Sequence, residues 1–159
     1  MNYKEFLESK THLSGNFGFD PLYMPDYLFD FQKYIAEYAI KKGRGAIFLD
    51  TGLGKTAIQL TIAENTVRKT NKRVLILTPL AVAFQFIKEA KKIGISDIEH
   101  SKDGKFKEKI VVSNYERLHY FNSTDFGAVL LDESSILKNY DGATRDRITI
   151  FMKKIKYRY

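Results

Sequence analysis

Apolar residues recur along the chain in two patterns, which predict helices alternating with short strands. Helical spacing is found in four segments, at residues 28–42, 55–69, 82–93 and 142–155. Between them lie short continuous apolar runs typical of buried parallel strands, at residues 46–49, 74–77, 110–112 and 128–131. Strands that alternate with helices predict right-handed βαβ units and a mainly parallel sheet, that is, a three-layer α/β/α domain.

The first helical segment and the residues around it set the expected domain limits. In residues 28–42 the apolar pattern places one face of the helix at Phe31, Ile35, Tyr38 and Ala39, and Gly43 and Gly45 end it. Residues 1–27 are rich in Gly, Pro and aromatic residues towards their end and are predicted to be an irregular N-terminal segment. Residues 98–109 are expected to be a charged loop with a weak edge strand, and 115–120 a short helix.

A glycine-containing loop lies between the strand predicted at residues 46–49 and the helix that follows. It reads Asp-Thr-Gly-Leu-Gly-Lys-Thr over residues 50–56. Gly52 and Gly54 can adopt backbone angles that turn successive N–H groups towards an anion at a helix N-terminus. Lys55 would then reach the β- and γ-phosphates of a nucleotide, and the Thr56 hydroxyl would ligate Mg²⁺. The strict phosphate-loop pattern has Gly where this chain has Leu49, so a plain turn before a helix stays open as the alternative.

Two adjacent carboxylates follow the last of the predicted strands. Asp132 and Glu133 come directly after the apolar run 128–131. In nucleotide hydrolases an aspartate in this place holds Mg²⁺, and the carboxylate after it can activate the attacking water. Adjacent acids are also common on solvated surfaces. The two motifs together, in this order and at the carboxyl edge of one sheet, indicate a nucleotide site.

Composition narrows the class of protein and its partners. The 159 residues are 44% hydrophobic and include no cysteine, which fits one globular domain in a reducing, cytoplasmic compartment. No apolar run approaches the ~20 residues that cross a bilayer, so no membrane partner is expected. The formal net charge of +7 favours a polyanionic partner.

Five motifs in order resemble those of superfamily 2 helicases and translocases. They are Leu-Phe-Asp-Phe-Gln from residue 28, the glycine loop, Leu-Thr-Pro-Leu from residue 77, Val-Val-Ser-Asn-Tyr from residue 111 and Leu-Leu-Asp-Glu from residue 130. The series is most similar to that of Swi/Snf-like DEAD/DEAH-box helicase proteins of phages and prophages. The resemblance implies a RecA-like P-loop NTPase lobe over residues 28–159, with ATP and Mg²⁺ as cofactors and a second RecA-like lobe in cis or in trans.

The resemblance also assigns roles to individual residues. The Gln32 side chain would contact the adenine, with Tyr27 or Phe29 packing on the base. The phosphates would be bound by Thr51, Gly52, Leu53, Gly54, Lys55 and Thr56. Asp132 would hold Mg²⁺ together with Thr56, and Glu133 would be the general base. Ser134 and Ser135 depart from the Ala-His common in the family, which leaves coupling between hydrolysis and strand movement in doubt.

Nucleic-acid contacts are implied at two strand ends. Backbone amides and short hydroxyls would hold phosphates of one strand at Thr78, Pro79, Leu80, Ser113, Asn114 and Tyr115. Such contacts do not read bases, so we expect binding that is independent of sequence and weakens with salt, to DNA rather than RNA. Basic residues in the 102–109 loop and in the last helix would extend this surface or form an ordinary solvated face.

The sequence therefore predicts the N-terminal ATP-binding lobe of a DNA helicase or translocase. The chain stops before the third helicase motif of the family, so we expect one lobe that binds ATP weakly and hydrolyses it slowly. Two alternatives stay open. One is a non-catalytic nucleic-acid-binding or regulatory fragment that retains the helicase scaffold, and the other is a P-loop kinase or another phosphotransferase.

Overall fold

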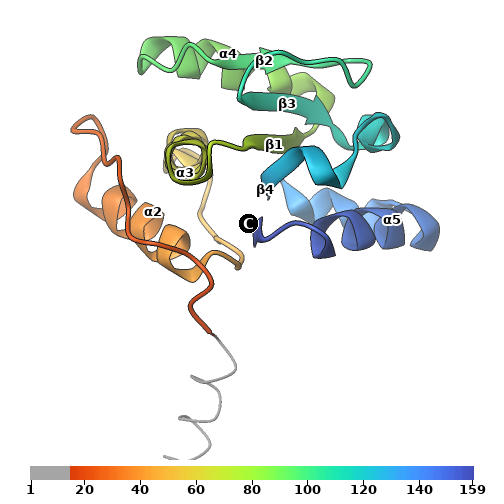
Figure 1. The fold of residues 1–159 in the computed structure, drawn as a ribbon, viewed down its shortest axis with the longest axis horizontal. Helices are drawn as coiled ribbons and strands as arrows, with labels where there is room; N and C mark the ends of the chain where they lie inside the picture. Colours follow the sequence, from red (N-terminus) through yellow and green to blue (C-terminus); the bar gives the residue numbers. More distant parts are fainter. Residues whose placement is uncertain (1–14) are drawn as a thin grey trace, which may run out of the picture.

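The structure, a computed structural model, describes residues 15–159 and contains a five-stranded parallel sheet (Figure 1). Its strands are β1 Arg73–Thr78, β2 Ile98–His100, β3 Ile110–Asn114, β4 Phe126–Leu131 and β5 Tyr157–Arg158. Their order in the sheet is β2-β3-β1-β4-β5, and every neighbouring pair is parallel. The predicted strands at 74–77, 110–112 and 128–131 and the weak edge strand after residue 98 are confirmed.

Helices cover both faces of this sheet, which confirms the three-layer α/β/α architecture. They are α2 Asp30–Lys42, α3 Lys55–Thr70, α4 Ala83–Lys92 and α5 Gly142–Lys153. Short 3₁₀ helices lie at Leu80–Val82 (η1), Tyr115–Tyr120 (η2), Ser123–Asp125 (η3) and Ser134–Asn139 (η4). The predicted helical segments are thus found within about two residues of their expected limits, a normal uncertainty at helix ends.

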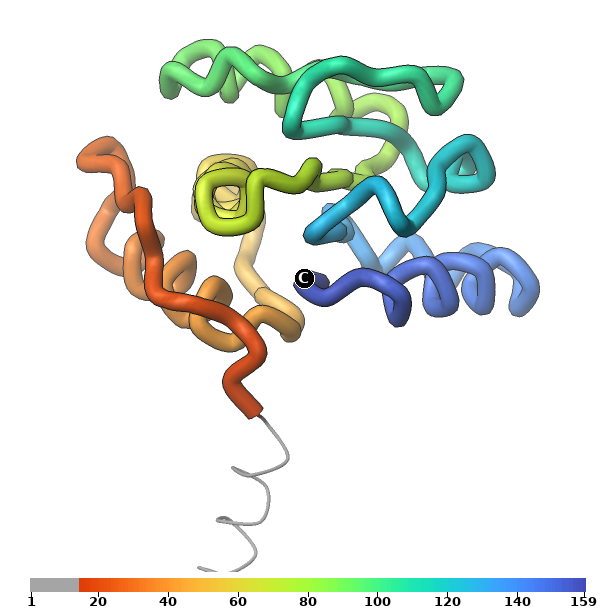
Figure 2. The backbone as a smooth tube through the Cα atoms, viewed as in Figure 1, coloured from red at the N-terminus to blue at the C-terminus, as the bar shows by residue number. Residues whose placement is uncertain are grey.

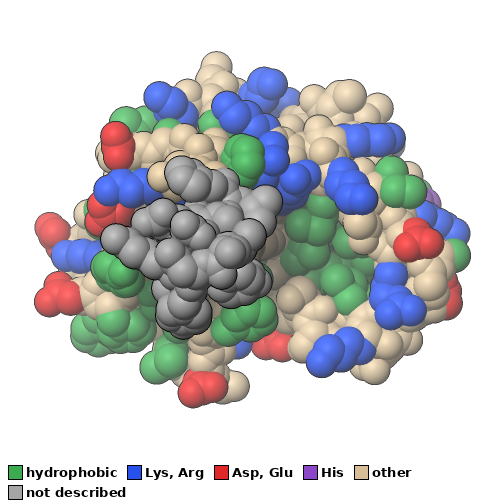
Figure 3. Space-filling model, turned by 90° about the horizontal axis from the view of Figure 1, so that it is seen from below, with side chains coloured by type: hydrophobic (Ala, Val, Ile, Leu, Met, Phe, Trp, Pro, Cys, Tyr) green, Lys and Arg blue, Asp and Glu red, His purple; other side chains and the backbone are tan. Residues whose placement is uncertain are grey.

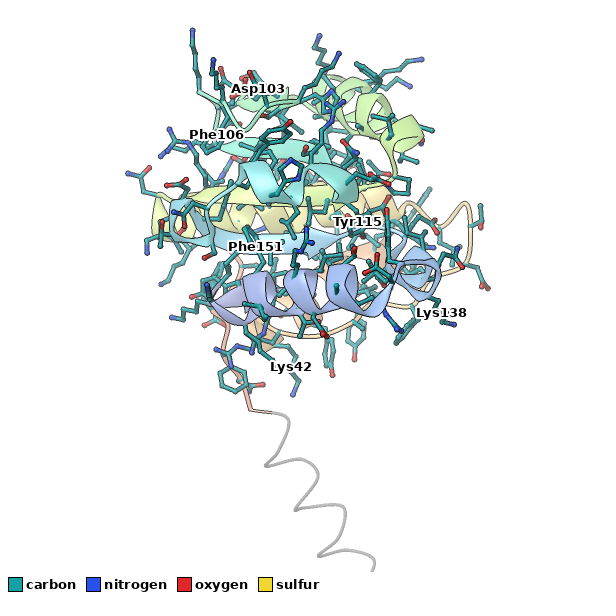
Figure 4. All side chains as sticks on the ribbon, turned by 90° about the vertical axis from the view of Figure 1, so that its right-hand side faces the viewer. Lys42, Asp103, Phe106, Tyr115, Lys138 and Phe151 are labelled. Carbon is teal, nitrogen blue, oxygen red and sulfur yellow. The ribbon has the colours of Figure 1, made fainter. Side chains whose placement is uncertain are left out.

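Alternate side chains of the central strand enter two separate cores. Val74 and Ile76 of β1 face α2, α3 and α4, whereas Leu75 and Leu77 face α5 and η2. This alternation is what period-two strand geometry requires when a strand is buried on both faces. Tyr115 and Phe151, with Phe106 at the margin, belong to the second core and are labelled in Figure 4.

The segment before α2 has no helix or strand within the described residues 15–29. It runs alongside α2 (Figure 2) and is fixed by backbone hydrogen bonds, such as that from Phe17 N to the carbonyl oxygen of Lys42. The buried Asn65 of α3 accepts hydrogen bonds from the backbone N–H groups of Leu22 and Tyr23. The rest of the predicted irregular segment, residues 1–14, lies outside the described residues.

The prediction of which residues of α2 face the core is wrong. Its buried residues are Gln32, Ala36, Ala39 and Ile40, while Phe31 and Tyr38 are exposed. Of the predicted set, only Ala39 is buried and Ile35 partly so. Because α2 packs against α3, small side chains are needed at the contact, and the aromatic residues turn outwards.

The strand predicted at residues 46–49 does not form. Arg44 makes an isolated parallel bridge to Arg158, and Gly45 N donates to the carbonyl oxygen of Arg158, but residues 46–49 are irregular. A strand needs a partner along its whole length, and β5 extends only to Arg158. Residues 46–49 have the apolar composition of a strand. Within the described residues, however, β5 is too short to pair with them.

Candidate nucleotide-binding site

The glycine loop leads directly into the N-terminus of α3. Gly52 and Gly54 have positive φ angles of 84° and 78°, as predicted for a loop that turns its amides inwards. Gly54 is the N-cap of α3 and provides no side chain to the free N–H groups of the first turn. These N–H groups and the helix dipole favour an anion at this position. Thr51, Gly52 and Leu53 are exposed, and Lys55 and Thr56 are half-buried at the start of the helix.

Gln32 connects α2 to this loop. Its side-chain Nε2 donates a 3.0 Å hydrogen bond to the carbonyl oxygen of Leu53, and its Oε1 accepts a 3.0 Å hydrogen bond from Phe29 N. The side chain is only 7% exposed. Gln32 thus holds the loop against α2 through both atoms of its amide, and its contact with adenine stays a prediction. Phe29 is 69% exposed and stacks on Phe31 with 6.2 Å between the ring centroids.

Asp132 is joined to α3 and to the end of β1. Its Oδ1 accepts a 2.8 Å hydrogen bond from Gln59 Nε2, and its Oδ2 accepts a 3.0 Å hydrogen bond from the Thr78 hydroxyl. Gln59 lies three residues after Thr56 and so on the same face of α3. The helix of the glycine loop and the acidic pair therefore meet at one edge of the sheet.

Two further contacts fix the backbone of Asp132. Its N–H donates to the carbonyl oxygen of Leu77, and its own carbonyl oxygen accepts a 2.5 Å hydrogen bond from the hydroxyl of Tyr115. Burial, with a contribution from the charge of Asp132, raises the pKa of the Tyr115 hydroxyl, which therefore stays protonated and keeps donating. Asp132 is thus held in place by α3 and β1 through its carboxylate and by η2 through its backbone carbonyl.

Glu133 differs from Asp132 in both exposure and backbone. Its side chain is exposed, and its φ of 51° lies in the left-handed region, which only Asn71 shares among the described non-glycine residues. Such a conformation costs on the order of 1 to 3 kcal/mol for a non-glycine residue. It ends β4 abruptly and starts η4, so that the carboxylate of Glu133 lies at the surface beside the buried Asp132.

The oxygen atoms around Asp132 are of the kind that fits Mg²⁺. Gln59 Oε1 is buried without a hydrogen-bond partner in the described part of the chain, and it belongs to the same amide that contacts Asp132. An unpaired buried oxygen next to a carboxylate is suited to a hydrated cation, whose water molecules donate to both. Asp132 and the Thr56 hydroxyl would be the protein groups closest to that ion. The described residues contain no cluster of three acidic or histidine side chains, so an ion here would depend on water and phosphate oxygens.

Most residues predicted to contact nucleic acid have buried side chains. Thr78 and Ser113 are fully buried, and the Ser113 hydroxyl donates to the carbonyl oxygen of Ser101. Asn114 donates to the Glu116 carboxylate, and the Tyr115 hydroxyl is occupied by Asp132. Only Pro79 and Leu80 present side chains at the surface. The expectation that short hydroxyls at these positions reach phosphates is therefore not met, and their backbone amides remain the candidates.

Sequence reasoning missed two residues that organise this site. Gln59 could have been found from its spacing, because it shares a helix face with Thr56 one turn into α3. From the sequence, Tyr115 was predicted to bind nucleic acid. In the structure its ring belongs to the second core, and its hydroxyl donates to the backbone carbonyl of Asp132. No local pattern distinguishes these two roles for a tyrosine.

Comparison with known proteins shows similarity to helicases in sequence and in fold. Residues 28–148 match the family model described as type III restriction enzyme, res subunit. The chain is 29% identical over 146 residues to the uncharacterized ATP-dependent helicase YqhH of Bacillus subtilis, and the match covers 84% of this chain. It covers 26% of YqhH, so the chain spans about a quarter of that relative.

Solved structures share the fold at low sequence identity. The UvsW helicase of bacteriophage T4 superposes with a TM-score of 0.71 at 16% identity, covering 99% of this chain and 58% of that one. The Swi2/Snf2 ATPase core of Sulfolobus solfataricus, solved with double-stranded DNA, has a TM-score of 0.64 at 19% identity. The match covers 88% of this chain and 32% of that one. The chain belongs to the family of the type III restriction enzyme res subunit and has the fold of the N-terminal RecA-like lobe of superfamily 2 helicases.

Proposed function

We propose that this lobe binds Mg²⁺-ATP and the phosphate backbone of DNA, as part of an ATP-dependent helicase or translocase. The observation that carries the proposal is the hydrogen bond from Gln59 to Asp132, because it joins the helix of the glycine loop to the acidic pair. A single triphosphate bound at the loop would lie next to both.

Each residue of the site has a distinct task in this proposal. The amides from Thr51 to Gly54 and the first turn of α3 bind phosphate oxygens, and Lys55 neutralises their charge. Asp132 and Thr56 would hold Mg²⁺, which neutralises the charge that develops on the phosphates. Glu133, exposed next to Asp132, accepts a proton from the attacking water. Phe29, exposed at the start of α2, packs on the base.

Slow turnover is expected of residues 1–159 alone. In related phosphate chemistry an arginine finger from a second domain contributes about 10³- to 10⁵-fold to turnover. Without such a group, the lobe binds the nucleotide in a competent arrangement but leaves the transition-state charge largely uncompensated. The lobe therefore needs a second lobe, in the same chain or in another, for steady motor activity.

Binding of fluorescent ATP with and without Mg²⁺ tests the nucleotide site. Lys55→Ala should weaken the affinity at least about tenfold, because it removes the charge that faces the phosphates. Lys92→Ala, at the exposed end of α4, is the matched control and should bind like the wild type. Equal affinity of the Lys55→Ala and wild-type proteins would instead favour a scaffold that no longer uses nucleotide.

Binding of labelled single- and double-stranded DNA tests the second half of the proposal. Affinity should fall steeply as salt rises and change little with base sequence, because the contacts are to phosphates. Duplex RNA of the same length serves as the comparison. No dependence on salt between 50 and 200 mM would contradict a phosphate-binding surface.

A further inference from the structure

A groove of about 720 Å³ lies between η2 and α5, away from the nucleotide site. One wall consists of residues between Tyr115 and Ser123, and the other of residues between Thr144 and Lys154. In Figure 4, Tyr115 lies towards the start of α5 and Phe151 towards its end, on the side of the helix that faces the sheet. Ten residues of helix span about 15 Å, so the groove is elongated. We call this space the α5 groove.

The floor of the α5 groove is apolar. It is formed by buried side chains of the second core, among them Leu118 and Phe151. Apolar surface continues onto both margins, where Tyr120 of η2 is 52% exposed and Ile150 of α5 is 54% exposed. An apolar hollow with exposed apolar margins and a charged rim is typical of a surface that binds another molecule.

The charged rim of the groove is positive. Arg147 and Lys154 line it, and neither makes a salt bridge to another described residue. They are seven residues apart, which places them on one side of the helix and about 10 Å apart along its axis. Glu116 is the one acidic residue among the described lining residues, and its carboxylate already accepts hydrogen bonds from Tyr140 and Asn114.

The surface around the groove has the same sign of charge. Arg145, Lys153 and Lys156 are exposed on α5 or just after it, whereas Asp146 is the acidic residue within the helix. In the right half of Figure 3, where α5 lies, more Lys and Arg than Asp and Glu side chains are visible. A positive field of this kind speeds the association of an acidic ligand.

We propose that the α5 groove binds an acidic amphipathic helix of a partner protein. Large apolar side chains at positions i, i+3, i+4 and i+7 of that helix would pack on the floor and on the margins. Acidic side chains seven positions apart would pair with Arg147 and Lys154. About ten residues, or three turns, match the length of the groove.

Two other occupants fit this surface less well. A second copy of this chain has a net charge of +7 and would be repelled by the basic rim. Duplex DNA offers phosphates to Arg147 and Lys154, but a phosphate backbone has no apolar face to cover Tyr120 and Ile150. The combination of an apolar floor with two cations therefore favours a polypeptide that has both apolar and acidic side chains.

Fluorescence anisotropy with a labelled peptide tests the proposal. The probe is Ser-Glu-Leu-Glu-Asp-Leu-Leu-Glu-Asp-Phe-Leu-Glu-Glu, which has an apolar helical face and acidic residues seven positions apart. It should bind saturably to residues 1–159. Two control peptides should bind at least about tenfold more weakly. One has the same residues in an order that spreads the apolar side chains around the helix, and the other has lysine at every acidic position.

Two double variants of α5 test the charges with a matched control. Arg147→Glu, Lys154→Glu should weaken binding of the acidic peptide by about tenfold or more, because it replaces attraction with repulsion at the rim. Arg145→Glu, Lys153→Glu changes the net charge equally on the same helix, but these residues do not line the groove, and it should weaken binding by less than about threefold. Urea midpoints of both variants show that the fold is retained.

A single variant tests the apolar margin. Ile150→Ala should weaken peptide binding by about threefold or more, because it removes apolar surface at the edge of the groove. Leu22→Ala, at a position 55% exposed and outside the groove, is the control and should bind the peptide like the wild type.

Several outcomes would overturn the proposal. These are no saturable binding of the acidic peptide up to about 1 mM, equal binding of the three peptides, and equal losses in the two double variants. Duplex DNA provides a further arm. If its affinity falls in Arg147→Glu, Lys154→Glu while that of the peptide does not, the two charges serve nucleic acid instead.

The groove and the nucleotide site can be tested independently. Neither the glycine loop nor Asp132 and Glu133 line the groove, so fluorescent ATP should bind equally to the wild type and to Arg147→Glu, Lys154→Glu. Peptide binding by a lobe that binds no ATP would uphold this inference and count against the proposed function. ATP binding by a lobe that binds no peptide would do the reverse.

Discussion

Gln59 of α3 donates a 2.8 Å hydrogen bond from its side-chain amide to Oδ1 of Asp132, which follows β4. The bond spans 73 positions in the sequence and joins the two motifs on which the functional interpretation depends. The other carboxylate oxygen of Asp132, Oδ2, accepts a hydrogen bond from the Thr78 hydroxyl. Asp132 therefore has a defined orientation in the protein before any ligand binds.

Removal of the Gln59 amide should destabilise the domain and disturb the site. Gln59→Leu leaves a largely buried carboxylate with one donor fewer, which should cost about 1.5 kcal/mol of unfolding free energy. Urea unfolding measures this change, and the Mg²⁺ dependence of ATP binding should weaken in parallel. Gln85→Leu, at an exposed position of α4, is the control. If both variants are equally stable, the bond to Asp132 contributes nothing.

The two glycines of the loop should respond differently to substitution. Both have positive φ, so alanine strains the backbone at either site. A Cβ at Gly54 would also clash with Gln32 Nε2, whereas one at Gly52 meets no atom within 4 Å. Gly54→Ala should therefore lose more stability than Gly52→Ala, by about 1 kcal/mol or more.

The double variant Gln32→Ala, Gly54→Ala identifies the cause of that difference. If the clash with Gln32 is responsible, removing this side chain should recover part of the loss, so that the two substitutions are not additive. Thermal melts of the two single variants and of the double variant provide the comparison. Strict additivity would show that the Gly54 effect arises from its backbone alone.

Tyr115→Phe should destabilise the domain although it removes a single oxygen atom. The hydroxyl is buried and donates to the carbonyl oxygen of Asp132, so its loss leaves that acceptor unpaired at a cost of about 1 to 3 kcal/mol. Tyr120→Phe, where the ring is half exposed, should change stability by less than about 0.5 kcal/mol. Chemical denaturation of both proteins tests the difference, and similar midpoints would argue against a supporting role for Tyr115.

Stability should depend on pH through Glu116. The Tyr140 hydroxyl donates a 2.6 Å hydrogen bond to this carboxylate and, with a further bond from Asn114, holds the pKa of Glu116 below its usual value. Because the folded-state pKa is the lower one, this stabilisation is complete above the unfolded value of about 4.5 and is lost as the pH falls through the folded pKa.

Tyr140→Phe isolates this effect. The variant should be less stable than the wild type at pH 7, and the difference should shrink as the pH is lowered towards 3, because protonation of Glu116 removes the charge to which the Tyr140 hydroxyl donates. Tyr34→Phe, on the exposed face of α2, should show no difference at either pH. A Tyr140→Phe penalty of the same size at pH 3 and pH 7 would mean that the contact does not depend on the carboxylate charge.

Local periodicity was sufficient to predict the helices and the buried strands. Helices α3 and α4 contain their whole apolar pattern within one segment, and β1 and β3 are continuous apolar runs bounded by polar residues. Such signals depend on no distant residue. The glycine loop and the acidic pair could likewise be recognised, because each is contiguous in the sequence. The loop directly precedes α3, and the acidic pair directly follows β4.

The failures arose where distant residues decide the outcome. Residues 46–49 have the composition of a strand, but pairing depends on how far β5 extends. In α2 the aromatic residues dominate the pattern, yet Ala36 and Ala39 allow the close approach to α3. The hydroxyls of Thr78 and Tyr115 are occupied by Asp132, more than 15 positions away in each case. Sequence alone does not rank such competing partners.

The outward face of α2 bears on how the isolated lobe behaves in solution. Phe29, Phe31, Tyr34 and Tyr38 are all exposed on this helix or at its start, and Phe48 is exposed nearby in the sequence. Several exposed aromatic side chains on one helix promote self-association as concentration rises. Preparations of the lobe should therefore be kept dilute, and their aggregation should be suppressed more by replacing Tyr34 with a charged residue than by raising salt, which strengthens hydrophobic contact.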